Sequence, residues 1–197
     1  MRTLKFFIVL FALFLSKTYA QATTLNTITN DPESGIYLTA ADYKHNQLHL
    51  AGDQTTKNKF QLNDFFGGKT LTLNHNGKNY KFSKDSIYGY RDKKGSDYRF
   101  YKKHDAKYRI LENRSLVIYE FQRPGDKQTG FKPLLSYYYS EGVDGEVYPL
   151  TIDNLKRTFK EQAAFDIIDA NFKTDQDLVS YDTYNHMFRI NRLLARI

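Results

Sequence analysis

Period-two alternation constrains the fold more than any other feature of this chain. From Gly35 to Pro149, apolar and polar residues alternate in short runs that Gly, Asn, Asp and Lys clusters separate. Side chains of a strand point to its two faces in turn, so this period indicates half-buried strands. The predicted strands are residues 36–39, 47–51, 59–62, 70–74, 78–82, 87–91, 97–102, 108–112, 115–122, 134–140 and 146–148.

The spacing of these runs predicts how they are connected. Even spacing and short connections favour an antiparallel meander. Because a bare meander leaves its edges open, we expect partial closure into a barrel or a sandwich.

The segment Lys93–Gly95 predicts the register of one hairpin. It fits a three-residue loop, in which a type I turn is followed by a left-handed residue, the conformation that glycine adopts most easily. This loop places Tyr90 opposite Tyr98, and Arg91 opposite Asp97. Both pairings are favourable, since an aromatic ring meets a ring and a cation meets an anion.

A second predicted turn, at Asn113 and Arg114, sets Tyr108 against Tyr119 and Ile110 against Val117. We therefore expect one face of the sheet to collect Tyr88, Tyr90, Tyr98, Phe100, Tyr108, Ile110, Val117, Tyr119 and Phe121. The other face carries Arg91, Arg99, Arg109, Leu111, Leu116 and Ile118. Its apolar end needs a cover, which the C-terminal segment is expected to provide.

The period changes from two to 3.6 after Pro149. Thr151 can cap a first helix, and Asp182 a last one. The apolar positions of the helical pattern are Ile152, Leu155, Phe159, Ala164, Ile168, Phe172, Met187, Ile190 and Leu194. The fold class that follows is mainly β (α+β), with two or three C-terminal helices packed on the sheet.

The N-terminal residues have the features of a targeting segment. Arg2 and Lys5 precede a short apolar run, and small residues follow it, so residues 1–20 match a secretory signal peptide. Residues 21–34 are polar and predict a disordered leader. Residues 35–149 then form the antiparallel β domain, and residues 150–197 a helical segment of the same domain. We expect export to the periplasm, cell surface or medium, with no stable membrane span after cleavage.

Composition excludes several classes of function. The chain has no Cys, which rules out disulfides, thiolate metal sites and cysteine nucleophiles. Cleavage of the signal peptide lowers the formal net charge from +7 to +4. The remaining basic excess lies between Lys78 and Arg109, beside tyrosines that are expected to pair in the core. An exported protein rarely meets nucleic acid, so we expect no nucleic-acid partner.

Three arginines form the first candidate binding site. Arg91, Arg99 and Arg109 each follow a tyrosine, and on neighbouring strands they would form an anion-binding stripe. Alternation alone also explains them, because it places a polar residue after each core tyrosine.

The second candidate site is the loop from Arg123 to Lys132. It is long and polar, and Phe131 would serve as an anchor for a protein partner.

No complete catalytic or metal constellation is found. His45 and His49 have the zinc-peptidase spacing, but Asn46 stands where the general base is needed. Two acidic groups, at 141–146 and 175–182, do not match the twelve-residue calcium loop. We therefore expect no metal and no cofactor. Glu112 and Glu120 are candidate acids for glycoside hydrolysis only because they are acids within strands.

Three stretches carry a resemblance to known proteins: residues 35–39, 62–66 and 84–91, which read GIYLT, LNDFF and KDSIYGYR. They resemble small exported proteins of unassigned function that are common in Bacteroidota. The resemblance implies a Gram-negative envelope or secreted setting, and no catalytic residues.

Two functions remain open. The first is an exported non-catalytic domain that binds a partner, an envelope protein or a glycan, through its sheet or loop ends. The second is an envelope polysaccharide hydrolase with acidic catalysts. The absence of a complete catalytic set favours the first.

Overall fold

The computed structural model describes residues 33–52, 58–62, 68–125, 127 and 130–196. The predicted signal peptide lies outside the described residues, as do residues 21–32 of the predicted leader. Ser34, placed at the end of that leader, instead begins the first strand and is buried.

Within the described residues, eight antiparallel strands form a sheet in the order β11-β10-β9-β8-β7-β6-β1-β2. Their bounds are β1 Ser34–Tyr37, β2 His49–Gly52, β6 Gly89–Arg91, β7 Asp97–Tyr101, β8 Ala106–Asn113, β9 Val117–Arg123, β10 Leu134–Ser140 and β11 Tyr148–Pro149. The mainly β prediction is confirmed, but the sheet does not close, because β2 and β11 remain its edges. A short helix that the sequence analysis missed, α1 Ala40–Lys44, joins β1 to β2.

A second, smaller sheet interrupts the expected meander. It contains β3 Lys59–Leu62, β4 Thr70–His75 and β5 Lys78–Ser83. Leu71 and Leu73 of β4 pack with Tyr90 and Phe100 of the large sheet. The two sheets thus form a local sandwich, while β1 takes the place beside β6 that a simple meander would have given to β5.

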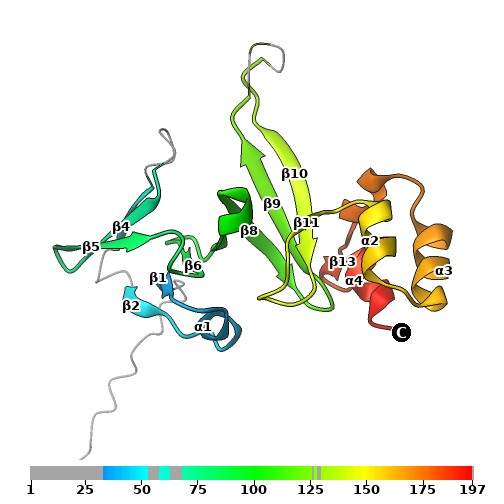
Figure 1. Cartoon of the computed structure of the whole chain (residues 1–197), viewed down its shortest axis with the longest axis horizontal. Coiled ribbons are helices and arrows are strands. Elements are labelled where there is room, and N and C mark those ends of the chain that lie inside the picture. The colour runs from blue at the N-terminus through cyan, green and yellow to red at the C-terminus, as the bar shows by residue number, and fades with distance from the viewer. Residues whose placement is uncertain (1–32, 53–57, 63–67, 126, 128–129, 197) are drawn as a thin grey trace, which may run out of the picture. The chain divides into compact units, whose positions relative to one another are not determined.

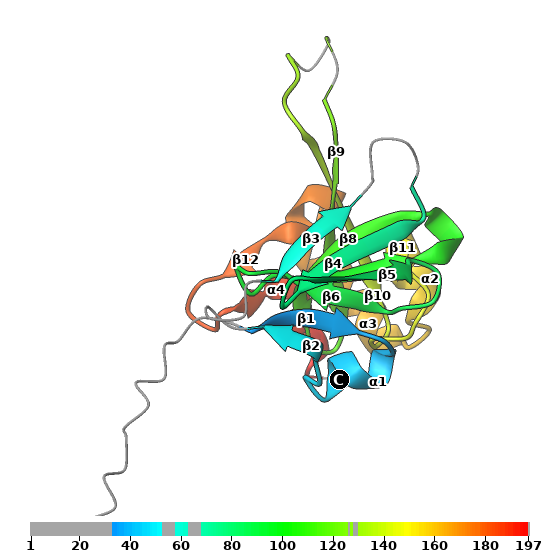
Figure 2. The ribbon, with the colours of Figure 1, turned by 90° about the vertical axis from the view of Figure 1, so that its left-hand side faces the viewer.

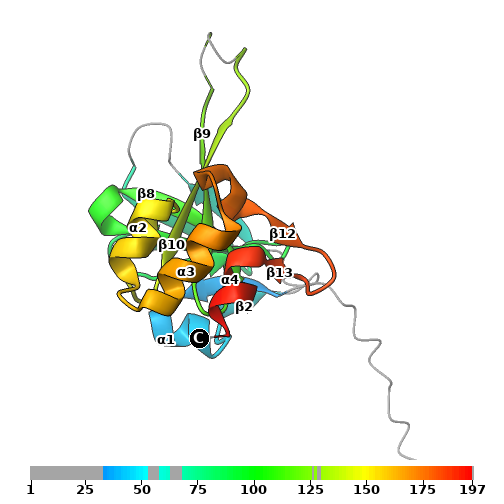
Figure 3. The same ribbon diagram turned by 90° about the vertical axis from the view of Figure 1, so that its right-hand side faces the viewer.

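The C-terminal helices pack on the other end of the large sheet, as expected (Figures 1 and 3). They are α2 Ile152–Thr158, α3 Gln162–Asn171 and α4 Arg189–Leu194, with a 3-10 helix, η3 Asp175–Val179, and a small hairpin of β12 Tyr181–Asp182 and β13 Met187–Phe188. Leu116 and Ile118 lie in the core that these helices form. This end of the sheet was predicted to need that cover.

The N-terminal caps are confirmed for the first of these helices and wrong for the last. The Thr151 hydroxyl accepts a hydrogen bond from the Asn154 backbone N–H at 3.2 Å. The Asp182 carboxylate instead accepts from Asn185 in the β12–β13 turn. α4 begins at Arg189, directly after β13, without a side-chain cap.

The β6–β7 hairpin has the predicted register. Tyr90 lies opposite Tyr98 with the two rings stacked at 4.8 Å, and Arg91 lies opposite Asp97. Gly95 has a φ of +76°, so the turn uses the left-handed conformation that the sequence predicts.

The predicted division of side chains between the two faces is wrong after β7. The connection to β8 contains the 3-10 helix η2 Lys102–His104 and Asp105, so Tyr101 pairs with Ala106. This register puts Arg109 opposite Tyr98, and Tyr108 opposite Arg99. Paired residues share a face of the sheet, and a four-residue connection pairs odd-numbered residues with even-numbered ones. Tyr98 and Tyr108 therefore lie on opposite faces.

The register between β8 and β9 also differs from the prediction. Ile110 lies opposite Tyr119, because the turn is longer than expected and a bulge at Leu111 adds one residue to β8. The shift amounts to two residues, so Tyr108, Val117 and Tyr119 still share a face and a buried cluster.

The turn at Gly95 yields the first prediction. A β-branched side chain resists positive φ, so we expect Gly95→Val to lower the free energy of unfolding by about 1–2 kcal/mol. Lys94→Val in the same turn is the matched control, since its side chain is exposed and should tolerate the change. Urea unfolding measures both. Equal destabilisation by the two variants would contradict the assigned turn.

Candidate functional site

One face of the large sheet has two covers with an open strip between them. The small sheet contacts Tyr90 and Phe100, and the C-terminal helices contact Ile118. The registers place all three on the same face, together with Arg109 and Glu120. Figure 1 shows β4 and β5 to the left of β8, β9 and β10, and the helices to their right. The strip between the covers is therefore where this face is accessible.

The large sheet divides at this strip. The pairing of β8 with β9 ends at Arg109 and Glu120. The pairing of β7 with β8 continues to Ala106, and that of β9 with β10 continues to Arg123. Beyond Glu120 the sheet is thus a fork of two hairpins, β7–β8 and β9–β10.

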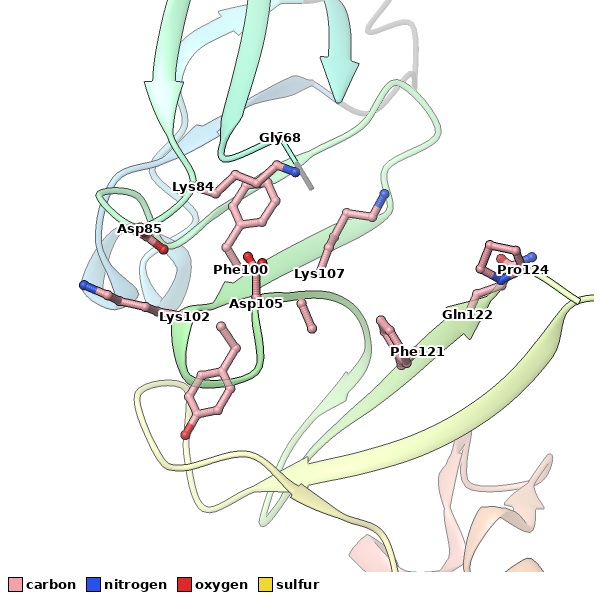
Figure 4. Close-up of a pocket in the computed structure, with 12 residues that line it drawn as sticks. Gly68, Lys84, Asp85, Phe100, Lys102, Asp105, Lys107, Phe121, Gln122 and Pro124 are labelled. Carbon is pink, nitrogen blue, oxygen red and sulfur yellow. The ribbon is translucent and has the colours of Figure 1, made fainter. Parts of the chain in front are cut away.

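A cavity of about 560 Å³ lies where the two hairpins separate (Figure 4). We call it the fork cavity. Its volume is within the range of small-molecule binding sites. Its apolar lining is Phe100, Tyr101, Ala106, Phe121 and Pro124. Its charged lining is Lys84, Asp85, Lys102, Asp105 and Lys107.

The fork cavity combines an aromatic lining with ammonium groups near it. The Nζ of Lys84 lies 5.9 Å from the centre of the Phe100 ring, and that of Lys107 lies 5.5 Å from the Tyr98 ring. In Figure 4 the Lys84 and Phe100 side chains lie together on one side, and Phe121 lies across from them on β9. This arrangement suits a ligand with an apolar body and a polar or anionic end.

A more polar groove of about 520 Å³ continues from the fork cavity and shares Lys107, Gln122 and Pro124 with it. Arg109 and Glu120 line it and lie 3.6 Å apart. Burial, and then the nearby Asp92 carboxylate, raise the pKa of Tyr98 at its edge. Both effects favour the neutral, protonated form of the Tyr98 hydroxyl.

The three predicted anion-binding arginines do not form a stripe. Arg91 donates two hydrogen bonds to Asp97, at 2.7 and 2.9 Å, and this pairing raises the pKa of Arg91. Arg109 lies on the opposite face from Arg91 and Arg99. The predicted common face is therefore wrong, and the cause is the change of face at the β7–β8 connection.

Arg99 is a core residue, 5% exposed. It donates to the Tyr119 hydroxyl at 2.8 Å and to the Gly145 carbonyl at 2.9 Å, and its guanidinium lies 5.1 Å from the Tyr101 ring. In the described part of the chain its hydrogen bonds all go to neutral oxygens. Arg99, which the predicted anion-binding stripe includes, is thus buried and hydrogen-bonded within the protein.

The second predicted site lies at the far end of the β9–β10 hairpin. Arg123 pairs with Leu134 there, and Phe131 is 69% exposed with a φ of +61°. Residues 126, 128 and 129 of the loop are outside the described residues. The Phe131 ring is therefore exposed, and the protein partner that it would anchor stays a prediction.

The two candidate acids, Glu112 and Glu120, lie on one face of the large sheet but have partners in different elements. The Glu112 carboxylate accepts hydrogen bonds from the Phe188 backbone and the Asn191 side chain, which fixes the start of α4. Glu120 pairs with Arg109 in the polar groove. Neither cavity includes Glu112 in its lining.

Histidines and acids form no metal site within the described ranges, where no group of three or more such residues has suitable geometry. His45 follows α1, and His49 lies on β2 beside Asp42, at 3.4 Å. No helix among the described residues has the length and apolar content needed to cross a bilayer.

The residues that line the fork cavity were missed by the sequence analysis. Phe100 and Phe121 were assigned to one face of the sheet, and Lys84 and Lys107 were counted only as part of the basic excess between Lys78 and Arg109. The length of the β7–β8 connection was the available signal, because a four-residue turn places Lys107 on the face of Tyr98.

Comparisons with protein-family models, with curated proteins and with solved structures give no match to this chain.

The buried guanidinium yields the second prediction. Arg99→Lys should lower the free energy of unfolding by about 2 kcal/mol, since one ammonium group cannot span the oxygens on β9 and the 141–147 loop. Arg114→Lys, an exposed arginine in the β8–β9 turn, should change it by less than about 0.5 kcal/mol. Denaturant unfolding compares the two. A similar, small effect of both variants would show that Arg99 is not a structural link.

Proposed function

We propose that this protein is an exported, non-catalytic binding domain of the cell envelope, and that its ligand occupies the fork cavity. The setting rests on the predicted signal peptide and on the resemblance to exported Bacteroidota proteins. The site rests on one observation, a cavity of about 560 Å³ with aromatic and lysine side chains in its lining. A cavity that combines apolar surface with a few polar groups is the usual form of a ligand site.

The lining suggests the chemical class of the ligand. Phe100 and Phe121 offer apolar surface, and among the described residues of the lining there are three lysines and two aspartates, Asp85 and Asp105. The preferred ligand is an amphiphile with an apolar or aromatic body and an anionic end. A glycan that carries acidic or acylated groups belongs to this class. A glycan of the envelope is therefore one candidate ligand.

Hydrolysis of an envelope polysaccharide has weaker support. Glu112 is occupied by the start of α4, and Glu120 has Arg109 as its partner. Asp85 and Asp105 do line one cavity. A hydrolase reading would therefore have to use these two aspartates, and Asp105→Asn would then abolish turnover of the polysaccharide.

Filling the cavity tests the binding proposal. Ala106→Phe adds a ring inside the fork cavity without removing a core side chain. We expect it to weaken binding of the anionic amphiphile 8-anilinonaphthalene-1-sulfonate at least about tenfold, which corresponds to about 1.4 kcal/mol. Dye fluorescence titration gives the dissociation constant.

Two controls make the result specific. Ala163→Phe introduces the same ring at an exposed position of α3 and should leave dye affinity unchanged. Leu135→Ser removes an exposed apolar side chain outside the cavity and should also leave it unchanged. The proposal fails if the unaltered protein does not bind the dye, or if Ala106→Phe and Ala163→Phe affect binding equally.

A further inference from the structure

The β9–β10 hairpin continues beyond every other strand of the large sheet. β8 pairs with β9 only as far as Glu120, and β11 pairs with β10 only at Tyr138 and Tyr139. β9 and β10 still pair with each other as far as Arg123 and Leu134. Figures 2 and 3 show this part of the hairpin projecting from the sheet. We call residues 122–135 the ribbon end, and use only its described residues.

The ribbon end gathers exposed apolar side chains. Phe131 is 69% exposed, Leu135 51% and Leu134 40%. Among the described residues, Leu38 is the only other large hydrophobic side chain in this exposure class that is not a tyrosine. Since scattered exposed apolar residues are ordinary, their concentration at one place is what needs an explanation.

These side chains do not form one docking face. Leu134 and Leu135 are consecutive in β10, so they point to opposite faces of the ribbon. Phe131 lies beyond both, in the loop. A protein groove would cover one face and leave the other leucine in water. An apolar environment that surrounds the ribbon end on all sides would remove all three side chains from water.

The charge of the ribbon end favours a negatively charged medium. Arg123, Lys127 and Lys132 are the charged residues in the described part of the ribbon end, and all three are exposed cations. Cations beside exposed apolar side chains are typical of segments that bind the surface of anionic bilayers.

We propose that the ribbon end inserts its apolar side chains into the surface of an anionic lipid bilayer. The insertion is shallow, because an isolated two-stranded ribbon has two open edges, and hydrocarbon does not tolerate unpaired backbone groups. The apolar side chains therefore reach the interface, and the cations remain at the level of the headgroups. This proposal does not rest on the ligand proposed for the fork cavity.

A tryptophan reporter tests the proposal on the full chain, because the sequence contains no Trp. Phe131→Trp places the reporter in the ribbon end. Tyr184→Trp is the matched control, at a residue that is 90% exposed in the β12–β13 turn. Both are titrated with vesicles of equal parts phosphatidylglycerol and phosphatidylcholine, with and without bromine-labelled acyl chains.

With these vesicles, emission from position 131 should move to shorter wavelength and be quenched by bromine, while emission from position 184 should not change. Adding Leu134→Ser and Leu135→Ser to the Phe131→Trp variant should weaken its partitioning about tenfold or more. Pure phosphatidylcholine or high salt should also weaken it.

Three results would overturn the proposal. The first is an unchanged spectrum at position 131, and the second is an equal response at both positions. The third is a shift at position 131 that depends on protein concentration in the absence of vesicles, which would show that the ribbon end binds a second protein chain.

Discussion

The extra residue at Leu111 is the local constraint at which the large sheet divides into two hairpins. A β-bulge bends the strand that contains it and increases the local twist. In this protein the bulge lies next to the last residues at which β8 and β9 pair, Ile110 and Arg109. Beyond it β8 stays with β7, and β9 stays with β10. The fork, the cavity inside it and the projecting ribbon all begin next to this one local change in geometry.

The distribution of cations follows from the same registers. The basic excess between Lys78 and Arg109 resembles one continuous patch in the sequence, but the fold divides it among different roles. Arg91 is neutralised by Asp97, and Arg99 is enclosed by tyrosines and backbone oxygen. Lys84, Lys102 and Lys107 are among the described residues that line the fork cavity. Charge counted along the chain therefore overstates the positive surface that a ligand meets.

Features that depend on neighbouring residues were predictable from the sequence. The strands, the left-handed Gly95 turn and the Thr151 cap each need only a few adjacent residues, and each is present as expected. The faces depend on the number of residues in each connection. One misjudged turn after Tyr101 moved Arg109 to the other side of the sheet. The small sheet and the place of β1 beside β6 required pairings between distant segments, for which alternation carries no signal.

The fork cavity was harder to predict for a different reason, because it lies where strand pairing stops. The alternation of apolar and polar residues in β9 continues through Phe121 without a change. The sequence therefore does not indicate that the pairing of β8 with β9 ends at Glu120.

The root of the ribbon also forms a wall of the cavity. Phe121 and Gln122 line the cavity, and Gln122 pairs with Leu135 in the ribbon end. The projecting part of the hairpin and this wall of the cavity therefore belong to the same pair of strands. Any displacement of the ribbon end would therefore also displace this part of the cavity wall.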